Sequence, residues 1–244
     1  GIRVGVSYPW LARVFAYPHA TVRLNFRRVF EWEGDIHPRE NQAVAWQNVG
    51  TPMREPMLPA NAPILASLGL PVEYAVTDST RFGLAQIEKR LRAGLKLLQV
   101  REPSLDEAAR AAFTRKVIEL AHRHGCKVMV KTPFAGADGV HYTASELVRI
   151  TSRPEGLLAA ASCHSREELE RAMVLGLDFA VLGPVKPTPS HPGRSPLGWE
   201  SFSRIVAGST LPVYAIGGLS AEDLRTAWEA GAHGVALLSA AWRG

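Results

Sequence analysis

Short apolar segments alternate with longer amphipathic segments along the last two thirds of the chain. Amphipathic stretches with helical periodicity occur at residues 81–94, 104–124, 165–175 and 220–230. Around them lie eight apolar runs, which are YAVTD, LKLLQV, KVMVK, GVHY, LAAAS, FAVLG, VYAIG and GVALL. Strands buried on both faces read as nearly continuous apolar runs, whereas surface helices carry a one-sided apolar stripe. The alternation predicts an α/β fold, and eight strands predict a closed (β/α)8 TIM-type barrel over residues 74–244.

At two places the predicted barrel has too few residues for the helix that would follow a strand. Too few residues separate KVMVK from GVHY to form a helix, and nothing long follows the last apolar run. One helix start is well marked, because Ser165 can cap the 165–175 helix, with Glu168 three residues later as its capping-box partner. We place the start of the barrel domain near residues 68–73.

The first 68 residues follow a different pattern. HATVRLNFRRVFEW (residues 19–32) and QAVAWQNV (residues 42–49) have the composition of strands, and EGD between them predicts a turn. Residues 51–63 contain four prolines and predict an irregular connector, and ILASLG (residues 64–69) predicts a short helix after it. This part of the chain therefore forms a separate, smaller domain in our interpretation.

Composition and charge narrow the kinds of partner. The chain is 46% hydrophobic and 21% charged, as in globular proteins that bury a core. The net charge is +5, but the basic residues are scattered, which favours anionic small molecules over nucleic acid. No apolar run reaches the roughly 18 residues of a membrane span, and no signal peptide opens the chain. Cys126 and Cys163 lie in apolar stretches, so we expect unpaired thiols and a cytoplasmic location. The oligomeric state is left open.

Polar side chains follow almost every predicted strand. In a barrel of this type the ligand binds at the carboxyl ends of the strands, so these residues are the candidate site. They form a polar, partly cationic ring that suits a small phosphorylated ligand. The ring consists of Thr77, Asp78, Gln99, Arg101, Lys131, Thr132, His141, Ser162, His164, Thr188, Gly217, Gly218 and Ser239.

Gly217 and Gly218 stand where a strand meets a helix. Glycine allows a positive φ and a close approach of ligand to backbone, and the amino end of a helix favours anions. The pair follows the seventh predicted strand and Ser239 follows the eighth, which is where such barrels commonly hold a phosphate. We therefore expect phosphate contacts at Gly217, Gly218 and Ser239. The alternative is a plain strand-to-helix turn.

Seven segments carry a family resemblance. They are YAVTD, LQVRE, ADGVH, SCHSREELERA, LDFAVLGPVKPT, VYAIGG and AGAHGVALLS. In order and approximate spacing, this part of the chain resembles the thiamine phosphate synthase and thiazole tautomerase (TenI-like) superfamily. The resemblance implies a barrel that binds a thiazole phosphate, with no cofactor firmly implied. It also implies substrate or phosphate contacts from Gln99, Arg101, Ser162 and Thr188, in addition to those of the glycine pair and Ser239.

The chain departs from the synthase pattern where pyrophosphate and magnesium bind. Synthases place Gln-x-Arg-x-Lys after the second strand, and here Gln99 and Arg101 match whereas Pro103 replaces the lysine. Their Asn-Asp pair after the third strand, whose Asp binds magnesium, corresponds to Lys131-Thr132. Without these groups a magnesium pyrophosphate loses most of its charge neutralisation.

Two further positions also depart from the synthase pattern. A second metal-binding Asp matches Glu146 at best, and His191 replaces a loop lysine. The tautomerase branch fits better, because VREPS resembles its Arg-Glu-x-Ser and His164 falls on its catalytic histidine. A histidine titrates near neutral pH and is suited to proton transfer at carbon. His141 belongs to a packing position in this interpretation.

The resemblance leaves three functions open for the barrel. The main expectation is an enzyme that binds a thiazole phosphate and tautomerises it. One alternative is a barrel without catalysis that serves as a phosphate-ligand sensor or scaffold. The other is a true thiamine phosphate synthase.

The first 68 residues carry a second resemblance. RVFEWEGD, RENQAVAW and LPANAPI resemble the latter part of mutator-type Nudix hydrolases, the 8-oxo-dGTP diphosphatases. The Nudix box is absent, and Gly1-Ile2 match its last two positions, so we expect an incomplete α+β Nudix domain. The resemblance implies Mg²⁺ and a nucleotide only in an intact parent, with Glu40 as a metal or catalytic residue and Asn61 reading the purine edge. The alternatives are a solvated glutamate and a turn-forming asparagine.

Overall fold

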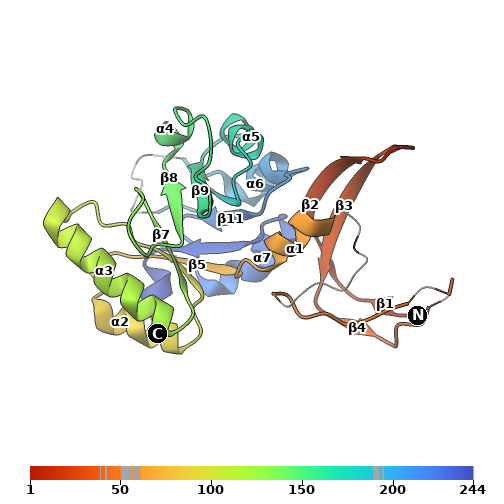
Figure 1. The fold of residues 1–244 in the computed structure, drawn as a ribbon, viewed down its shortest axis with the longest axis horizontal. Coiled ribbons are helices and arrows are strands. Elements are labelled where there is room, and N and C mark those ends of the chain that lie inside the picture. The colour runs from red at the N-terminus through yellow and green to blue at the C-terminus, as the bar shows by residue number, and fades with distance from the viewer. Residues whose placement is uncertain are drawn as a thin grey trace.

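Eight parallel strands form a closed barrel in the computed structural model, which describes residues 1–38, 40–41, 43–50, 57, 61–188, 193 and 195–243 (Figure 1). Each strand pairs with the next, and the last pairs with the first, as the (β/α)8 prediction requires. The strands are β5 (Glu73–Val76), β6 (Leu97–Gln99), β7 (Lys127–Val130), β8 (Gly139–Tyr142), β9 (Leu158–Cys163), β10 (Phe179–Leu182), β11 (Val213–Ile216) and β12 (Gly234–Leu237).

Helices follow most of the strands and cover the outside of the barrel. Four of them coincide with predicted segments: α2 (Leu84–Arg92), α3 (Glu107–Arg123), α5 (Arg166–Val174) and α7 (Leu224–Glu229), which the 3₁₀ turn η2 (Ala221–Asp223) precedes. Two were not predicted, α4 (Ala144–Leu147) and α6 (Gly198–Val206), because one is a single turn and the other follows a proline-rich stretch. Residues 131–138, all described, contain no helix, as expected, and η3 (Ala240–Trp242) follows β12.

Aromatic side chains fill the middle of the barrel. Tyr74, Phe179 and Tyr214 are fully buried and point inward from β5, β10 and β11. The ring of Phe179 meets the other two nearly edge to face, with centroids 5.3 Å apart in both pairs. Burial of such rings stabilises the fold by roughly 2–3 kcal/mol each, and their geometry adds to this. The packed centre leaves the ends of the strands as the places where a ligand can bind.

The start of α5 differs from the prediction in one detail. Ser165 is the N-cap, and its hydroxyl accepts from the Glu168 amide at 3.3 Å. The Glu168 carboxylate, however, accepts from the amide of His164 at 2.5 Å rather than from that of Ser165. The predicted capping box is therefore wrong in its second half, because the carboxylate reaches one residue further back. This shift ties His164 to the helix.

The front of the chain is built on a long antiparallel hairpin of β2 (Ser7–Ala16) and β3 (Thr21–Val29). Two short strands, β1 (Arg3–Val4) and β4 (Trp32–Glu33), pair beside it, and α1 (Ala62–Leu68) leads into the barrel. The strand predicted at residues 42–49 is wrong for residues 43–49, which form no ladder. There Trp46 stacks on Trp32 instead, with ring centroids 5.5 Å apart. The predicted connector falls largely on residues outside the described part.

The hairpin packs beside the barrel, against the amino-terminal ends of β11 and β12 (Figure 1). The Ala12 amide donates to Ser209 O at 2.9 Å, and the Trp10 indole donates to His233 Nδ1 at 3.3 Å. The Arg28 guanidinium donates to the carbonyls of Ala232 and His233 at 2.6 and 2.7 Å. Ser209, Ala232 and His233 precede β11 and β12, so the hairpin binds where these strands begin. The opposite, carboxyl end of the barrel is left for a ligand.

No helix in the described part of the chain is both long enough and apolar enough to cross a membrane.

Candidate functional site

The predicted ring of polar residues lies at one end of the barrel. Because all eight strands are parallel, the residues that follow them meet at the carboxyl end. Two predicted residues do not join them. Asn61 is the N-cap residue of α1, which leads to the amino end of β5, and Glu40 is an exposed residue beyond β4 in the front segment. Their predicted nucleotide and metal roles therefore belong to a different part of the molecule.

The glycine pair has a structural cause that the sequence did not reveal. Gly217 and Gly218 have φ angles of +102° and +65°, which L side chains rarely adopt. A Cβ on Gly217 would lie 2.5 Å from Pro184 Cβ, and one on Gly218 would lie 2.5 Å from Pro187 O. The loop after β10 therefore packs against both glycines. Their role as phosphate ligands stays a prediction.

Lys186 brings a positive charge to the glycine pair. Its amide donates to Gly217 O at 3.0 Å, and its ammonium lies 2.6 Å from Asp223 Oδ1. Desolvation raises the pKa of Asp223, but hydrogen bonds from Lys186 and Ser220 outweigh it and hold the pKa below its usual value. Lys186 was not among the predicted site residues. Its signal in the sequence is a single lysine in the otherwise apolar run after β10.

Arg81 brings a second positive charge, beside Ser239. One of its guanidinium nitrogens donates to Ser239 Oγ at 2.6 Å and lies 4.0 Å from Asp78 Oδ2. The loops that carry Lys186, the glycine pair, Ser239 and Arg81 follow β10, β11, β12 and β5, which are neighbours in the barrel. Two cations and the glycine pair therefore occupy one side of the barrel mouth. Sequence reasoning missed Arg81 because it stands five residues beyond the strand.

A chain of hydrogen bonds runs from the barrel interior to this end. Tyr74 Oη lies 2.9 Å from His141 Nδ1, and His141 Nε2 lies 2.9 Å from Ser162 Oγ. Burial and, to a smaller extent, the charge of Arg101 lower the pKa of His141 to about 4, and Glu146 opposes this shift. His141 is therefore neutral near pH 7, with one nitrogen donating and the other accepting. It orients a predicted site residue, Ser162, in addition to packing.

His164 has a fixed ring orientation. Its Nδ1 lies 2.7 Å from the carbonyl oxygen of Gly183, which can only accept, so Nδ1 carries the hydrogen. In the neutral ring the lone pair is then on Nε2, which can take or return a proton. The His164 amide is held by Glu168. The predicted proton-transfer role of His164 stays a prediction.

Arg101 and Glu102, which follow β6, have different roles. Glu102 is buried, and its carboxylate accepts from the Thr77 hydroxyl at 2.5 Å and from the Ser79 amide at 2.9 Å. Glu102 therefore fastens the loop after β5 to the end of β6. The Arg101 side chain is exposed, and within the described residues it forms no ion pair. Its charge is directed to the barrel mouth, where it acts on His141.

An ion pair joins Glu146, which matches one magnesium-binding position of the synthase pattern, to Lys131, the residue before the other. Lys131 Nζ lies 3.4 Å from Glu146 Oε1, and the other carboxylate oxygen accepts from the amide and hydroxyl of Thr143, both at 2.8 Å. In the described part of the chain, no three His, Cys, Asp or Glu residues form a group that could hold a metal ion. His191, the other replaced position, lies outside the described residues.

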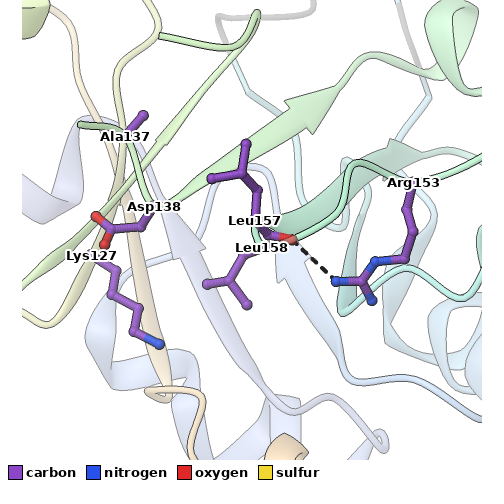
Figure 2. Close-up of a pocket in the computed structure, with 7 residues that line it drawn as sticks. Lys127, Ala137, Asp138, Arg153, Leu157 and Leu158 are labelled. Carbon is purple, nitrogen blue, oxygen red and sulfur yellow. Dashed lines mark hydrogen bonds between the residues drawn. The ribbon is translucent and has the colours of Figure 1, made fainter. Parts of the chain in front are cut away.

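A cavity of about 480 Å³ lies at the opposite end of the barrel (Figure 2). Its walls come from the amino-terminal ends of β7, β8 and β9, with Lys127, Asp138 and Arg153 as its charged residues. Arg153 donates to Leu157 O at 3.1 Å and pairs with Asp178, and Asp138 accepts from the Val128 amide at 2.7 Å. Two of its three charged groups thus hold the fold together, and the cavity is remote from the strand-end ring.

The barrel part of the chain is similar in sequence to known proteins. The family model described as thiamine monophosphate synthase matches residues 73–241. The thiamine-phosphate synthase of Thioalkalivibrio sulfidiphilus is 32% identical over 181 residues, which cover 68% of this chain and 85% of that protein. The thiamine-phosphate synthase of Nostoc punctiforme is 31% identical over 173 residues, which cover 68% of this chain and 49% of that longer protein.

The solved structures agree on the fold. A thiamine phosphate pyrophosphorylase from Pyrococcus furiosus superposes with a TM-score of 0.57 at 23% identity, covering 68% of this chain and 85% of that one. The family match begins at residue 73, at the first residue of β5. Residues 1–72 lie outside it, so the Nudix interpretation of the front segment stays a prediction.

Proposed function

We propose, because this chain belongs to the thiamine monophosphate synthase family, that its barrel binds a thiazole phosphate at the carboxyl end of the strands. The observation that carries the proposal is the grouping of Lys186, Arg81 and the glycine pair on one side of the barrel mouth. A phosphate monoester carries up to two negative charges, which two cations and adjacent backbone amides neutralise. Lys186 pairs with Asp223, and Arg81 donates to Ser239. A bound phosphate would accept hydrogen bonds from the same two cations.

The proposed reaction on this ligand is tautomerisation by His164. The Gly183 carbonyl holds Nδ1 of the ring, so Nε2 is the nitrogen that would move the proton. Ser162, which the neutral His141 holds by a hydrogen bond, supplies a hydroxyl on β9, two residues before His164. Proton transfer by a positioned side chain contributes typically 10²–10⁴-fold to rate. The reaction needs no pyrophosphate and no metal ion.

Thiamine phosphate synthesis is the second candidate. The names of the relatives favour it, and Gln99 and Arg101 match the pyrophosphate-binding positions of synthases. Coupling joins a thiazole phosphate to a pyrimidine with loss of pyrophosphate, whose charge must be neutralised. Pro103 and Thr132 stand where the synthase pattern has two groups that do this, a lysine and the magnesium-binding aspartate. Both candidates share the thiazole phosphate site.

Calorimetry tests the shared site. We expect thiazole phosphate to bind the full chain at least tenfold more tightly than its dephosphorylated form. Lys186→Gln should remove most of this difference, whereas Lys116→Gln on the outer face of α3 should not. Gly218→Asp is a poorer test because its side chain would also displace the loop at Pro187. Equal affinity for the two ligands in the wild-type chain would refute the proposal.

A coupled assay then separates the candidate reactions. Tautomerisation predicts conversion of the thiazole phosphate tautomers by nuclear magnetic resonance, with loss of conversion in His164→Ala. Synthesis predicts thiamine phosphate when pyrimidine pyrophosphate and magnesium are added. Tight phosphate-dependent binding with neither product would favour the third function, a phosphate-ligand sensor or scaffold.

The front segment is proposed separately as the latter part of a Nudix-type domain. Its motifs support this, and the hairpin followed by α1 is consistent with an α+β domain. Glu40 and Asn61 remain its candidate metal-binding and base-reading residues. The Nudix box glutamates that bind magnesium are absent from the sequence, so we expect no magnesium-dependent hydrolysis of 8-oxo-dGTP by these 244 residues. Measurable hydrolysis would show that this assignment is wrong.

A further inference from the structure

We propose that the Lys131–Glu146 ion pair takes the place of a divalent cation at the mouth of the barrel. The ammonium of Lys131, attached to the end of β7, supplies the positive charge beside Glu146 that a metal ion supplies in the synthase pattern. Ligand binding at this end is then independent of magnesium. The inference rests on the proposed function for its ligand, but the metal titration below uses no thiazole phosphate.

The donor atoms do not fit a magnesium ion. Mg²⁺ requires about six oxygen ligands at roughly 2.0–2.1 Å, and its protein ligands are usually one or two carboxylates. Glu146 is the carboxylate at this place, and both of its oxygens are in use. Thr143 donates twice to Oε2, and Lys131 lies against Oε1. A protonated lysine has no lone pair to offer a metal.

The Glu146 carboxylate also caps the first turn of α4. Thr143 and Glu146 form the capping box of α4, so the carboxylate satisfies the amide at the helix start. Desolvation raises the pKa of Glu146, but the Thr143 hydrogen bonds and the Lys131 charge outweigh it and lower the pKa below its usual value. The group is thus a charged carboxylate with a structural partner on one side and a cation on the other.

The charge balance is the same with and without the metal. A magnesium ion between two carboxylates sums to zero, and Lys131 beside Glu146 also sums to zero. In the synthase pattern the metal-binding Asp falls on Thr132 and the asparagine before it falls on Lys131, so one negative charge is removed and one positive charge is added in place of the two charges of the metal. Arg101 is left as the cation of this region that has no carboxylate partner among the described residues, and a ligand's negative group can bind to it.

A titration with Mn²⁺, followed by electron paramagnetic resonance on the full chain, tests the inference. We expect Glu146→Gln to leave the Mn²⁺ binding of the chain unchanged, because Glu146 holds no metal in the wild type. Lys131→Asn/Thr132→Asp restores the Asn-Asp pair of the synthase pattern near Glu146 and should gain a site at least tenfold tighter than any in the wild type. Lys131→Met, which removes the charge without adding a ligand, should gain none. The triple variant Lys131→Asn/Thr132→Asp/Glu146→Gln should lose the gain.

The opposite results would overturn the inference. A tenfold loss of Mn²⁺ affinity in Glu146→Gln would show that the wild type already binds metal there. A Lys131→Asn/Thr132→Asp chain that keeps its circular dichroism spectrum and melting temperature yet gains no site would show that the geometry is not that of a replaced metal. In calorimetry, we expect the affinity for thiazole phosphate to differ less than twofold between EDTA and magnesium. A tenfold gain with magnesium that Glu146→Gln removes would also overturn it. Absence of thiazole phosphate binding altogether would refute the proposed function and leave the titration to stand alone.

Discussion

Single residues at the barrel mouth have their chemistry set by the atoms they contact. His164 has its proton placed on Nδ1 by Gly183 O, and His141 has both nitrogens engaged, by Tyr74 and Ser162. Two histidines in one site thus have different tasks. In the proposed function His164 exchanges a proton with the ligand, whereas His141 is buried and hydrogen-bonded to the Ser162 hydroxyl.

The orienting role of His141 predicts a particular kinetic effect. In Tyr74→Phe the ring of Tyr74 stays but its hydroxyl is lost, so His141 and Ser162 lose one end of their hydrogen-bond chain. We expect turnover of the thiazole phosphate to fall several-fold, with little change in its binding constant. Tyr214→Phe, a matched loss of a buried hydroxyl whose partner is Pro71 O at the other end of the barrel, should leave turnover unchanged. Equal effects of the two variants would contradict the orienting role.

Buried histidines also predict how stability depends on pH. Burial lowers the pKa of both His141 and His233 to about 4, below the ordinary value of 6.5. The folded state therefore resists protonation that the unfolded chain accepts, so stability is complete above pH 6.5 and is lost as the pH falls towards 4. Each histidine should cost about 2 kcal/mol between pH 7 and pH 5.

Urea denaturation at the two pH values measures this loss. Replacing His233 by Asn removes one titrating group, so the variant should lose about 2 kcal/mol less than the wild type over the same interval. Parallel pH profiles for the two proteins would mean that His233 does not carry the effect. His122, which is exposed and pairs with Asp138, provides the control substitution.

At the scale of elements, the loops after β10 and β11 form one packed unit. The Val185 amide donates to Ile216 O at 2.8 Å, so the two loops continue the pairing of their strands. Gly183 belongs to the same unit, since a Cβ there would lie 2.2 Å from Ile216 O. Packing therefore requires glycine at positions 183, 217 and 218, and a positive φ also requires it at 217 and 218.

A pair of matched glycines separates these two requirements. Gly218 and Gly176 share a φ of +65°, but a Cβ would meet Pro187 O at 2.5 Å on Gly218 and nothing within 4 Å on Gly176. Gly176→Ala should cost about 1–2 kcal/mol from the backbone alone. Gly218→Ala should cost roughly 1–3 kcal/mol more, from overpacking. Thermal unfolding of both variants checks this, and equal losses would contradict the role of the loop contact.

Elements of the barrel were predictable because each is coded locally. A buried parallel strand is apolar almost throughout, and α2, α3, α5 and α7 carry an amphipathic pattern, so both signals lie within a short window. The residues that follow each strand were predictable for the same reason. The hydrogen bond of Arg81 to Ser239, by contrast, joins positions 158 residues apart, and no local pattern reports it. The loop contacts of Gly218 and the His141 chain escaped prediction in the same way.

At the scale of the whole molecule, the front hairpin and the barrel share one interface. Arg28 is buried between the rings of Trp10, Phe30 and Trp228, with its carbon 5.4–5.8 Å from their centroids. Desolvation lowers the pKa of Arg28 to about 10, which leaves it charged near pH 7. A buried cation that donates to two backbone carbonyls is costly to remove, because the carbonyls lose their partner.

The shared interface predicts that hairpin and barrel unfold together. Tryptophan fluorescence reports the junction through Trp10 and Trp228, and far-ultraviolet circular dichroism reports the barrel helices. The two signals should give coincident denaturation curves. Arg28→Met should shift both to lower denaturant, by about 1–3 kcal/mol, without separating them. Two distinct transitions in the wild type would show that the hairpin is an independent unit.

The placement of the hairpin has a consequence for how the chain is made. Trp10 and Arg28 are synthesised early, but their partners at His233 lie 223 and 205 residues later. The hairpin therefore cannot make these contacts until almost the whole barrel has been synthesised. Until then its apolar face and the Arg28 guanidinium lack their partners in the barrel. Contacts so distant along the chain form slowly, and exposed apolar surface invites aggregation during that delay. We expect a nascent chain stopped before residue 209 to need a chaperone, which ribosome profiling of chaperone-bound chains can detect.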